Sequence, residues 1–449
     1  MRTKRVIIAI CAFIMTLNIS NAQFADFNNY PVTVTPHESP DSTRGHFWGY
    51  MFGSYFTKLH ADSAPRGNTQ YSQVPKGYNA FSLQRLYLGY DYFFNKQFSV
   101  HAVMASEENA DNYYTSSPTI DPKSNRSFYL KYANMEWANF FNTGLKLSVG
   151  AITTPSFAIT EEPFWGYRSI DRTIMDMKGI TGSNDFGASI GGKLWSKKDD
   201  MGIENACVGF NFMVGNGTGA VPDLFSLPVQ TPWHKYYGDI YVKAFGDKLV
   251  LDLFGDGRTW EWQSVPGQVH DMHQYILTGR AFLGYKTKNF NVSIEYFQQT
   301  AYNTVSQVSG PGVPVQGDTV NNIQSGYSIM AAVVLMRDKS TNAPKLSLFA
   351  RHDGYNPSVN FNPNITYLPG GMYINGSSYE LQNPVKESYY VFGLDYQPIK
   401  QIHFMPNIWY SANTTSQYNT TNPTPATDNQ KAGYDLVARI TFYYQFFKN

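Results

Sequence analysis

Apolar and polar residues alternate along most of this chain, from Phe47 to Phe447, in about sixteen stretches of roughly ten residues each. A period of two is typical of β-strands that separate two different environments. The lengths of the connections alternate as well: each short link is followed by a long polar segment. A soluble β-protein has no reason to gather its long loops at one end, whereas a membrane barrel has short periplasmic turns and long extracellular loops. The pattern therefore predicts an all-β fold, a transmembrane antiparallel β-barrel of about 16 strands.

The connections set the strand count. Short turns, rich in Asn, Gly, Asp and Lys, are expected at residues 95–97, 142–144, 196–201, 246–248, 286–289, 337–344 and 397–401. Long extracellular loops are expected at residues 59–79, 107–125, 153–183, 215–233, 257–270, 302–323, 354–386 and 413–432. Together they join about sixteen strands and leave both termini on the turn side. An even count is usual for single-chain bacterial barrels, and a miscount of one pair leaves fourteen or eighteen strands as alternatives.

Strand parity assigns side chains to the two faces of the barrel. In the last strand Tyr434, Leu436 and Ile440 fall on one face, and Asp435 and Arg439 on the other. Lipid accepts only the first set, so the second set must face the interior. The same reasoning predicts a charged pore wall that includes Arg85, Lys131, Arg280, Arg351, Arg439, Asp395 and Asp435.

The expected inward charges nearly balance. Seven are basic and six acidic: Arg85, Lys131, Lys193, Lys243, Arg280, Arg351 and Arg439 against Asp91, Asp239, Glu295, Asp353, Asp395 and Asp435. Selection by an electric field needs a ring of one sign near the narrowest point. The balance therefore predicts weak ion selectivity or a transverse field, unless a local ring at the constriction overrides the sum.

A barrel of this size is too wide for side chains to fill, so its interior holds water unless a loop folds in. Loop three, residues 153–183, is the candidate, because its charges are interleaved with aromatic residues. Its expected constriction residues are Glu161, Glu162, Arg168, Asp171, Arg172, Asp176 and Lys178. The spacing of Arg168 and Arg172, with Ile170, Ile174 and Met177 on another face, predicts one short amphipathic helix. The alternative is an exposed loop with solvated charges.

Composition favours a barrel over a helical membrane protein. After residue 22 no uncharged apolar run approaches the roughly 18 residues that a spanning helix needs. Aromatic residues make up 16% of the chain and charged residues only 15%, against about 25% charged residues in typical soluble domains. An apolar band with aromatic girdles around a polar interior has this composition. A soluble β-sandwich, the alternative, would need more charge on its outer faces.

The first residues predict secretion. Basic residues precede an apolar core, and Ser20-Asn21-Ala22 is a small-residue cleavage site. We expect a signal peptide at residues 1–22, a periplasmic N-terminal lead-in at residues 23–45 and the barrel at residues 46–449. Loss of three basic residues takes the formal net charge from +1 to about −2. No nucleic acid is therefore expected as a partner.

Catalytic and metal-binding patterns are weak. The nine histidines are scattered, and no Ser-His-Asp arrangement emerges from their positions. His270, Asp271 and His273 form the closest cluster, but exposed loop residues without a third ligand at fixed spacing are usually just solvated. The sequence predicts no enzyme, no metal site and no cofactor.

Short motifs resemble a known family. The run Gly150–Phe157 (GAITTPSF), followed by Glu161, Tyr167-Arg168 and Asp171-Arg172, resembles the segment of phosphate-selective porin O and P type proteins in which a strand enters the constriction loop. Residues 84–89 and 349–353 are further matches. The resemblance covers most of the barrel in layout but only these pieces in residues. It implies a sixteen-stranded, commonly homotrimeric passive porin with loop three inside the pore.

These patterns together predict an outer-membrane porin, a passive channel for small hydrophilic solutes and ions. Whether anions such as phosphate are preferred stays open, because the inward charges are mixed. The alternative is a barrel that acts as an adhesin or structural partner without a conducting pore. The expected location is the bacterial outer membrane, with membrane lipid, lipopolysaccharide and the barrel assembly machinery as partners.

Overall fold

A computed structural model describes residues 44–63, 69–72, 74–107, 128–217, 234–261, 273–308, 314–361, 366–367, 373–374, 377–378, 384–415 and 433–446. The expected signal peptide and nearly all of the lead-in lie outside these residues and stay predictions. No helix in the described part of the chain is long and apolar enough to cross a membrane.

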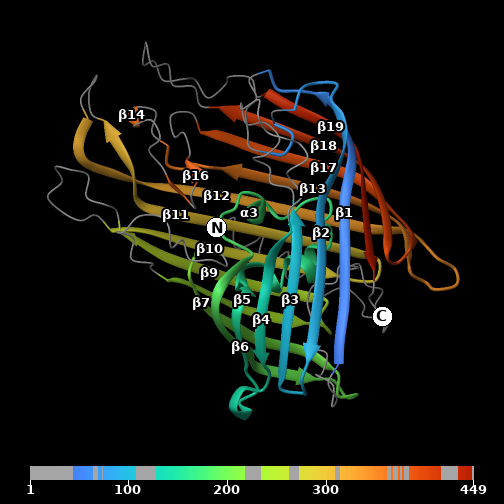
Figure 1. The fold of residues 1–449 in the computed structure, drawn as a ribbon. Helices are drawn as coiled ribbons and strands as arrows, with labels where there is room; N and C mark the ends of the chain where they lie inside the picture. The colour runs from blue at the N-terminus through green and yellow to red at the C-terminus, as the bar shows by residue number, and fades with distance from the viewer. Residues whose placement is uncertain are drawn as a thin grey trace, which may run out of the picture.

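Sixteen antiparallel strands form one closed barrel (Figure 1). They are β1 (Arg44–His60), β2 (Asn79–Phe93), β3 (Phe98–Glu107), β4 (Tyr129–Trp137), β5 (Lys146–Thr153), β6 (Asn184–Lys198), β7 (Glu204–Gly215), β8 (Lys235–Ala244), β9 (Leu249–Glu261), β10 (His273–Lys286), β11 (Phe290–Val308), β12 (Pro314–Arg337), β13 (Pro344–Asn356), β17 (Val385–Ile399), β18 (Ile402–Thr415) and β19 (Gly433–Phe446). The barrel closes where β1 pairs with β19, from Gly49 opposite Phe446 to His60 opposite Leu436. The expected fold class and strand count are confirmed.

Three short strands lie in the loop before β17. They are β14 (Thr366–Tyr367), β15 (Tyr373–Ile374) and β16 (Ser377–Ser378). β14 pairs with the end of β11, and β15 pairs with β16. β14 therefore extends the barrel wall beside β11, whereas β15 and β16 form a separate two-stranded sheet, and none of the three is a spanning strand.

Short and long connections alternate as expected, but several bounds differ, and the second turn and loop six show why. The second turn covers residues 138–145, between β4 and β5, because Asn139 adopts φ 51° and its side chain accepts the Gly144 N–H at 2.9 Å. Loop six covers only residues 309–313, because β11 and β12 stay paired as far as Val308 and Pro314. The Val and Thr residues in this hairpin favour the extended backbone, so polarity alone misplaces the strand ends.

The outer surface of the barrel is apolar. In β19 the outward Ile440 is 48% exposed, while the inward Asp435 and Thr441 are fully buried. Near the long-loop end, Tyr390, Tyr410 and Tyr434 of three neighbouring strands form a row of outward rings, as in an aromatic girdle. A closed barrel with this exterior satisfies its backbone groups internally and meets hydrocarbon outside. The fold therefore places the chain in the bacterial outer membrane.

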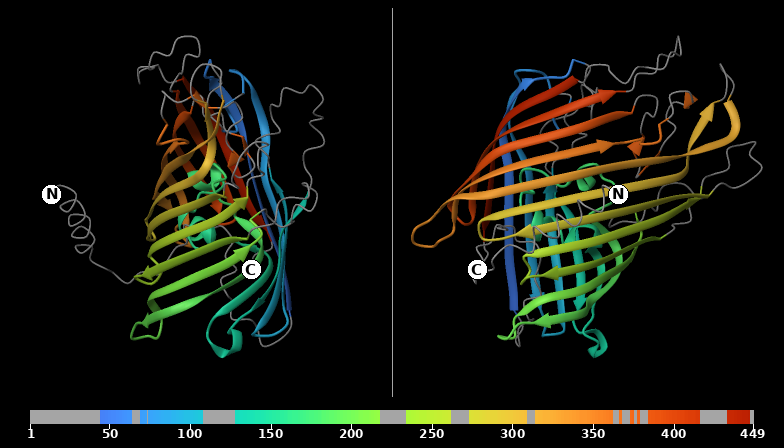
Figure 2. Two further views of the ribbon diagram at one scale, coloured as in Figure 1. Left: turned by 90° about the vertical axis from the view of Figure 1, so that its left-hand side faces the viewer. Right: turned by 180° about the vertical axis from the view of Figure 1, so that it is seen from behind.

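The segment between β5 and β6 lies inside the barrel. Figure 1 and the side view in Figure 2 both show its helical turns, in green, between the β1–β3 wall and the opposite wall. This segment, residues 154–183, is called loop three below, since β5 ends at Thr153.

Candidate pore constriction

Loop three is closed at its base. The Thr154 N–H donates to the Ser183 carbonyl at 3.1 Å, and the Thr154 hydroxyl donates to the Gly182 carbonyl at 2.7 Å. The two ends therefore leave the barrel wall together, and the residues between them form one compact lobe.

The lobe contains three short helical segments where the sequence predicts one helix. They are α2 (Pro155–Ala158), η3 (Glu161–Trp165), which is π-helical, and α3 (Ile174–Met177). Gly166, at φ 76°, ends η3, because a left-handed residue cannot continue a right-handed helix. Arg168 and Arg172 consequently lie in the turn before α3. The expectation that they share one amphipathic helix is wrong.

One side of the lobe is bonded to the wall of β10 and β11. Arg280 donates to the Ser156 carbonyl, and also to the Thr160 hydroxyl at 3.0 Å. The Asn291 amide donates to the Phe164 carbonyl at 2.6 Å. These wall side chains satisfy main-chain carbonyls that the short helices leave unpaired.

The other side of the lobe is held by two more wall arginines. Arg351 of β13 donates to the Asp171 carbonyl, and Arg439 of β19 donates to the Ile170 carbonyl, both at 2.8 Å. The predicted pore-wall residues Arg280, Arg351 and Arg439 thus face inward, but each is at most 4% exposed. They anchor loop three, a role that strand parity does not predict.

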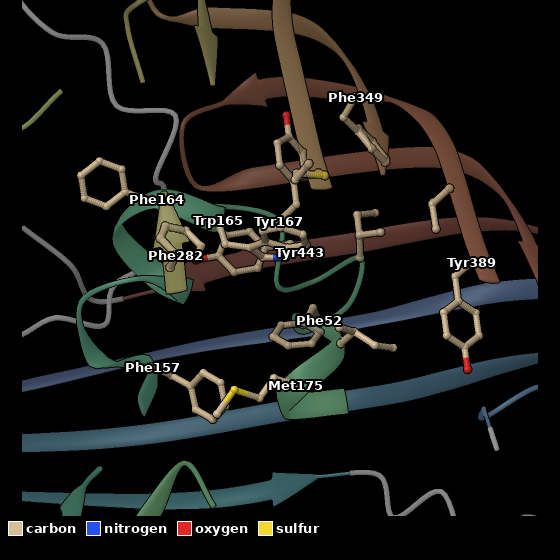
Figure 3. Close-up of a cluster of buried hydrophobic side chains, with 14 of the residues drawn as sticks. Phe52, Phe157, Phe164, Trp165, Tyr167, Met175, Phe282, Phe349, Tyr389 and Tyr443 are labelled. Atoms are coloured by element: carbon tan, nitrogen blue, oxygen red, sulfur yellow. The ribbon is translucent and has the colours of Figure 1, made fainter. Parts of the chain in front are cut away.

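Aromatic side chains pack the lobe against the wall. Trp165 is fully buried, and the Tyr167 ring packs at a tilt of 33° against Phe349 of β13, with ring centroids 4.9 Å apart. Burial of each such side chain contributes roughly 1.5–3 kcal/mol. Figure 3 shows these rings together with Phe157, Phe164, Phe282, Tyr389 and Tyr443.

The charges of loop three pair with one another. Arg168 lies 3.4 Å from Glu161 and 3.5 Å from Asp176, and Arg172 lies 3.4 Å from Asp176. Glu161 is fully buried and accepts hydrogen bonds from the Thr173 N–H and hydroxyl, both at 2.9 Å. The Arg172 side chain is 35% exposed, against 8% for Arg168. Arg172 is therefore the predicted constriction arginine that reaches solvent.

Burial and the neighbouring Asp176 raise the pKa of the Glu161 carboxyl to about 7, against the opposing effect of Arg168. Burial also works against the charge of Asp176, but Arg172 and Arg168 outweigh it and lower the pKa of that carboxyl. Loop three thus holds two neighbouring carboxyls, of which Glu161 keeps its proton to a higher pH and Asp176 favours the ionised form.

The other predicted constriction residues are less central. Lys178 reaches away to Glu387 of β17 at 2.5 Å and is 8% exposed as a residue. The Asp171 side chain accepts the Arg172 N–H at 2.8 Å. The side chain of Glu162 lies outside the described part of the structure and stays a prediction.

A second charge cluster lies on the wall of β2, β3 and β4. The Glu107 carboxylate lies 3.1 Å from Arg85 and 2.9 Å from Lys131, and it accepts hydrogen bonds from the Tyr87 and Tyr129 hydroxyls. Glu107 was expected at the start of loop two, so it is absent from the predicted wall residues. Glu107 lies two residues after Ala105 and four after Val103, both buried, so the alternation along β3 places its side chain on the same inner face.

The remaining predicted wall residues are also paired. Asp395 lies 2.9 Å from His403, and Asp435 lies 2.7 Å from Lys58. Lys58 also donates to the Tyr71 carbonyl at 2.5 Å, so part of loop one packs inward as well. Neither the role of Lys58 nor this inward packing was expected from the sequence.

The short-turn end of the barrel is more open. Lys193 of β6 faces inward with the parity of the buried Asp185, and its side chain is 53% exposed beside Glu204. Lys146 of β5 is 44% exposed beside Glu136. Charged side chains that face inward and remain exposed are in contact with water. Solvent therefore reaches the inner wall beside these two lysines, and this part of the wall is called the vestibule below.

Comparisons with known proteins identify the fold. No family model matches the sequence, and a search of curated proteins finds no match. The outer membrane channel DcaP of Acinetobacter baumannii aligns over 90% of this chain and 98% of its own, with TM-score 0.52 and 12% identity. OprB of Pseudomonas putida aligns over 90% of this chain and 94% of its own, with TM-score 0.51 and 11% identity. The chain has the fold of these outer-membrane barrels.

Proposed function

We propose that this protein is a porin, a passive outer-membrane channel for small hydrophilic solutes and ions. The observation that carries the proposal is loop three, a folded segment that is bonded to the inner wall of a sixteen-strand barrel, with solvent-exposed lysines on the inner wall near the short turns. A barrel of this width has room for water beside such a segment. Loop three then forms the constriction, and Arg172 is its most exposed arginine.

The pairing of inward charges supports weak selectivity. Arg85 and Lys131 share Glu107, Lys193 pairs with Glu204, and Arg351 lies 2.5 Å from Asp353. Phosphate selection requires a row of positively charged side chains along the pore. These contacts instead pair positive with negative side chains. We propose a channel with little preference between anions and cations, in which phosphate passes without a dedicated site.

Swelling of proteoliposomes in neutral sugars of increasing size tests conduction without any assumption about charge. Swelling that is fast for small sugars and falls steeply with size supports a constricted channel. No swelling, with the barrel folded, would instead support the alternative of an adhesin or structural partner. The same preparation, analysed by native mass spectrometry in detergent, tests the homotrimer that the family resemblance implies.

One group of wall residues has the composition of a catalytic triad. The Ser99 hydroxyl lies 2.9 Å from His101 Nε2, and His101 Nδ1 lies 2.8 Å from Asp91. However, His101 Nε2 also lies 3.6 Å from Glu136. Two carboxylates favour the charged imidazolium, which donates to the serine and cannot take its proton. We therefore propose that this trio is a structural part of the wall and that the protein is not an enzyme.

A further inference from the structure

The Glu107 cluster is built like a binding site for an anion. The Oε1 atom faces Arg85 Nε at 3.1 Å, Lys131 Nζ at 2.9 Å and the Tyr87 hydroxyl. The Oε2 atom accepts the Tyr129 hydroxyl at 2.6 Å. Four donors, two of them charged, thus converge on one carboxylate. This is the donor set that a bound carboxylate or other small oxyanion requires.

The two cations of the cluster lie beneath the carboxylate. The Lys131 side chain is 3% exposed and the Arg85 side chain 9%, while Glu107 is 18% exposed. The Lys131 ammonium and the Arg85 guanidinium also lie over the Tyr87 ring, 5.2 and 5.9 Å from its centroid. The ring and the carboxylate together hold both cations in place. Glu107 is therefore the group that separates them from the solvent.

The cluster lies opposite the charged face of loop three. Arg85 interacts electrostatically with Arg168 and Asp176, and Asp176 interacts with Lys131 as well. The Glu107 cluster on β2, β3 and β4 therefore faces loop three, the segment that narrows the barrel. A change of charge here acts on ions where the channel is narrow, and bulk salt screens it least in such a place.

We propose that Glu107 is a residue that determines the ion selectivity of this channel. Its carboxylate occupies, as an intramolecular ligand, the four-donor site of Arg85, Lys131, Tyr87 and Tyr129. With Glu107 ionised, its carboxylate cancels one of the two positive charges and occupies the donors, so the site is closed to solute anions. Without that charge, the same donors form a site for small oxyanions beside the constriction. This inference rests on the proposed porin function.

The test is the reversal potential in planar bilayers under a KCl gradient, for wild type and for Glu107→Gln. Loss of one negative charge at the constriction should raise the chloride-to-potassium permeability ratio by about threefold or more. Acetate added to one side should reduce the chloride current through Glu107→Gln and not through wild type. The matched control is Glu204→Gln, which removes the same charge beside the exposed Lys193 in the vestibule and should change the ratio far less.

A double variant distinguishes an effect of the net charge of the cluster from an effect of altered structure. In Glu107→Gln with Lys131→Gln, the cluster has the same net charge as in wild type, so the permeability ratio should return toward the wild-type value. Equal shifts for Glu107→Gln and Glu204→Gln, or no return in the double variant, would overturn the assignment. Wild-type protein that inserts but does not conduct would overturn the porin function itself, and a conducting wild type with an unchanged Glu107→Gln would overturn only this inference.

Discussion

Lys178 of loop three and Glu387 of β17 form an ion pair of 2.5 Å, with side chains only 2% and 3% exposed. The ammonium also lies 5.0 Å from the centroid of the Tyr355 ring and 5.4 Å from that of Tyr389. The pair joins the end of loop three to the wall opposite its base. It therefore fixes how far the loop extends across the barrel.

The first prediction concerns this pair. Lys178→Met leaves a buried carboxylate without its cation, which typically costs roughly 3–5 kcal/mol. We expect a lower temperature for the loss of the compact form on SDS gels, and noisier single-channel current. Lys178→Met with Glu387→Leu should recover much of the lost stability, because neither charge then remains unpaired. If the double variant is as unstable as the sum of the singles, the two residues do not act as a pair.

The second prediction separates the two arginines of loop three. Arg172 is partly exposed, so Arg172→Ala should keep the fold, change the conductance and shift the permeability ratio toward cations about twofold. Arg168 is buried against Glu161, so Arg168→Ala should mainly destabilise the loop. The exposed Lys386 of β17 provides the control, and Lys386→Ala should alter neither property. Unchanged conductance and reversal potential in Arg172→Ala would place this residue outside the ion path.

The third prediction is a dependence of stability on pH. Glu161, in loop three, has its pKa raised to about 7 from an ordinary value of 4.5. A carboxyl with a raised pKa holds its proton more tightly when folded, so its contribution to stability is full below pH 4.5 and is lost as the pH rises through 7. A shift of this size corresponds to at most about 3 kcal/mol. The unfolding temperature should therefore fall between pH 5 and pH 8.

Glu161→Gln provides the comparison for this effect. The amide does not titrate, so the variant should lose less stability than wild type between pH 5 and pH 8. The fall in wild type also includes other inward groups, and only the difference between the two proteins reports on Glu161. Equal pH dependence in both would show that Glu161 is ionised throughout this range.

Strand parity predicted the inward faces well, because side-chain direction in a strand depends only on local backbone geometry. It could not predict which inward charges meet. Lys58 and Asp435 pair only because the barrel closes with a definite register between its first and last strands. Such pairing depends on the shear of the whole barrel, which no local pattern contains.

The interior of loop three was harder to predict for a different reason. Its aromatic and charged residues signalled an unusual loop, but the position of Gly166, at φ 76°, decides where η3 ends and where Arg168 points. The role of Arg280 as an anchor depends on the Ser156 carbonyl, a main-chain group that has no signature in the sequence. Glu107 was not predicted as a wall residue, because the polar residues that follow it made β3 look one residue shorter than it is.

The fourth prediction concerns export. Cleavage after Ala22 should leave a mature chain that begins at Gln23, because the preceding basic and apolar segments match a secretory signal. Intact mass spectrometry of protein from the outer-membrane fraction would show the mass of residues 23–449. A mass that includes Met1 in that fraction would show that the segment is retained.

The measurement that tests the porin account most directly is a planar-bilayer recording of the purified wild-type protein under a salt gradient. The account predicts stepwise ohmic conductance, with a reversal potential well short of the ideal value for either ion, because the inward charges are paired. Absence of any current step after repeated additions of folded protein to the bilayer would contradict the channel function. A reversal potential close to the ideal for anions, with block by phosphate, would contradict weak selectivity and show that the basic residues at the constriction dominate.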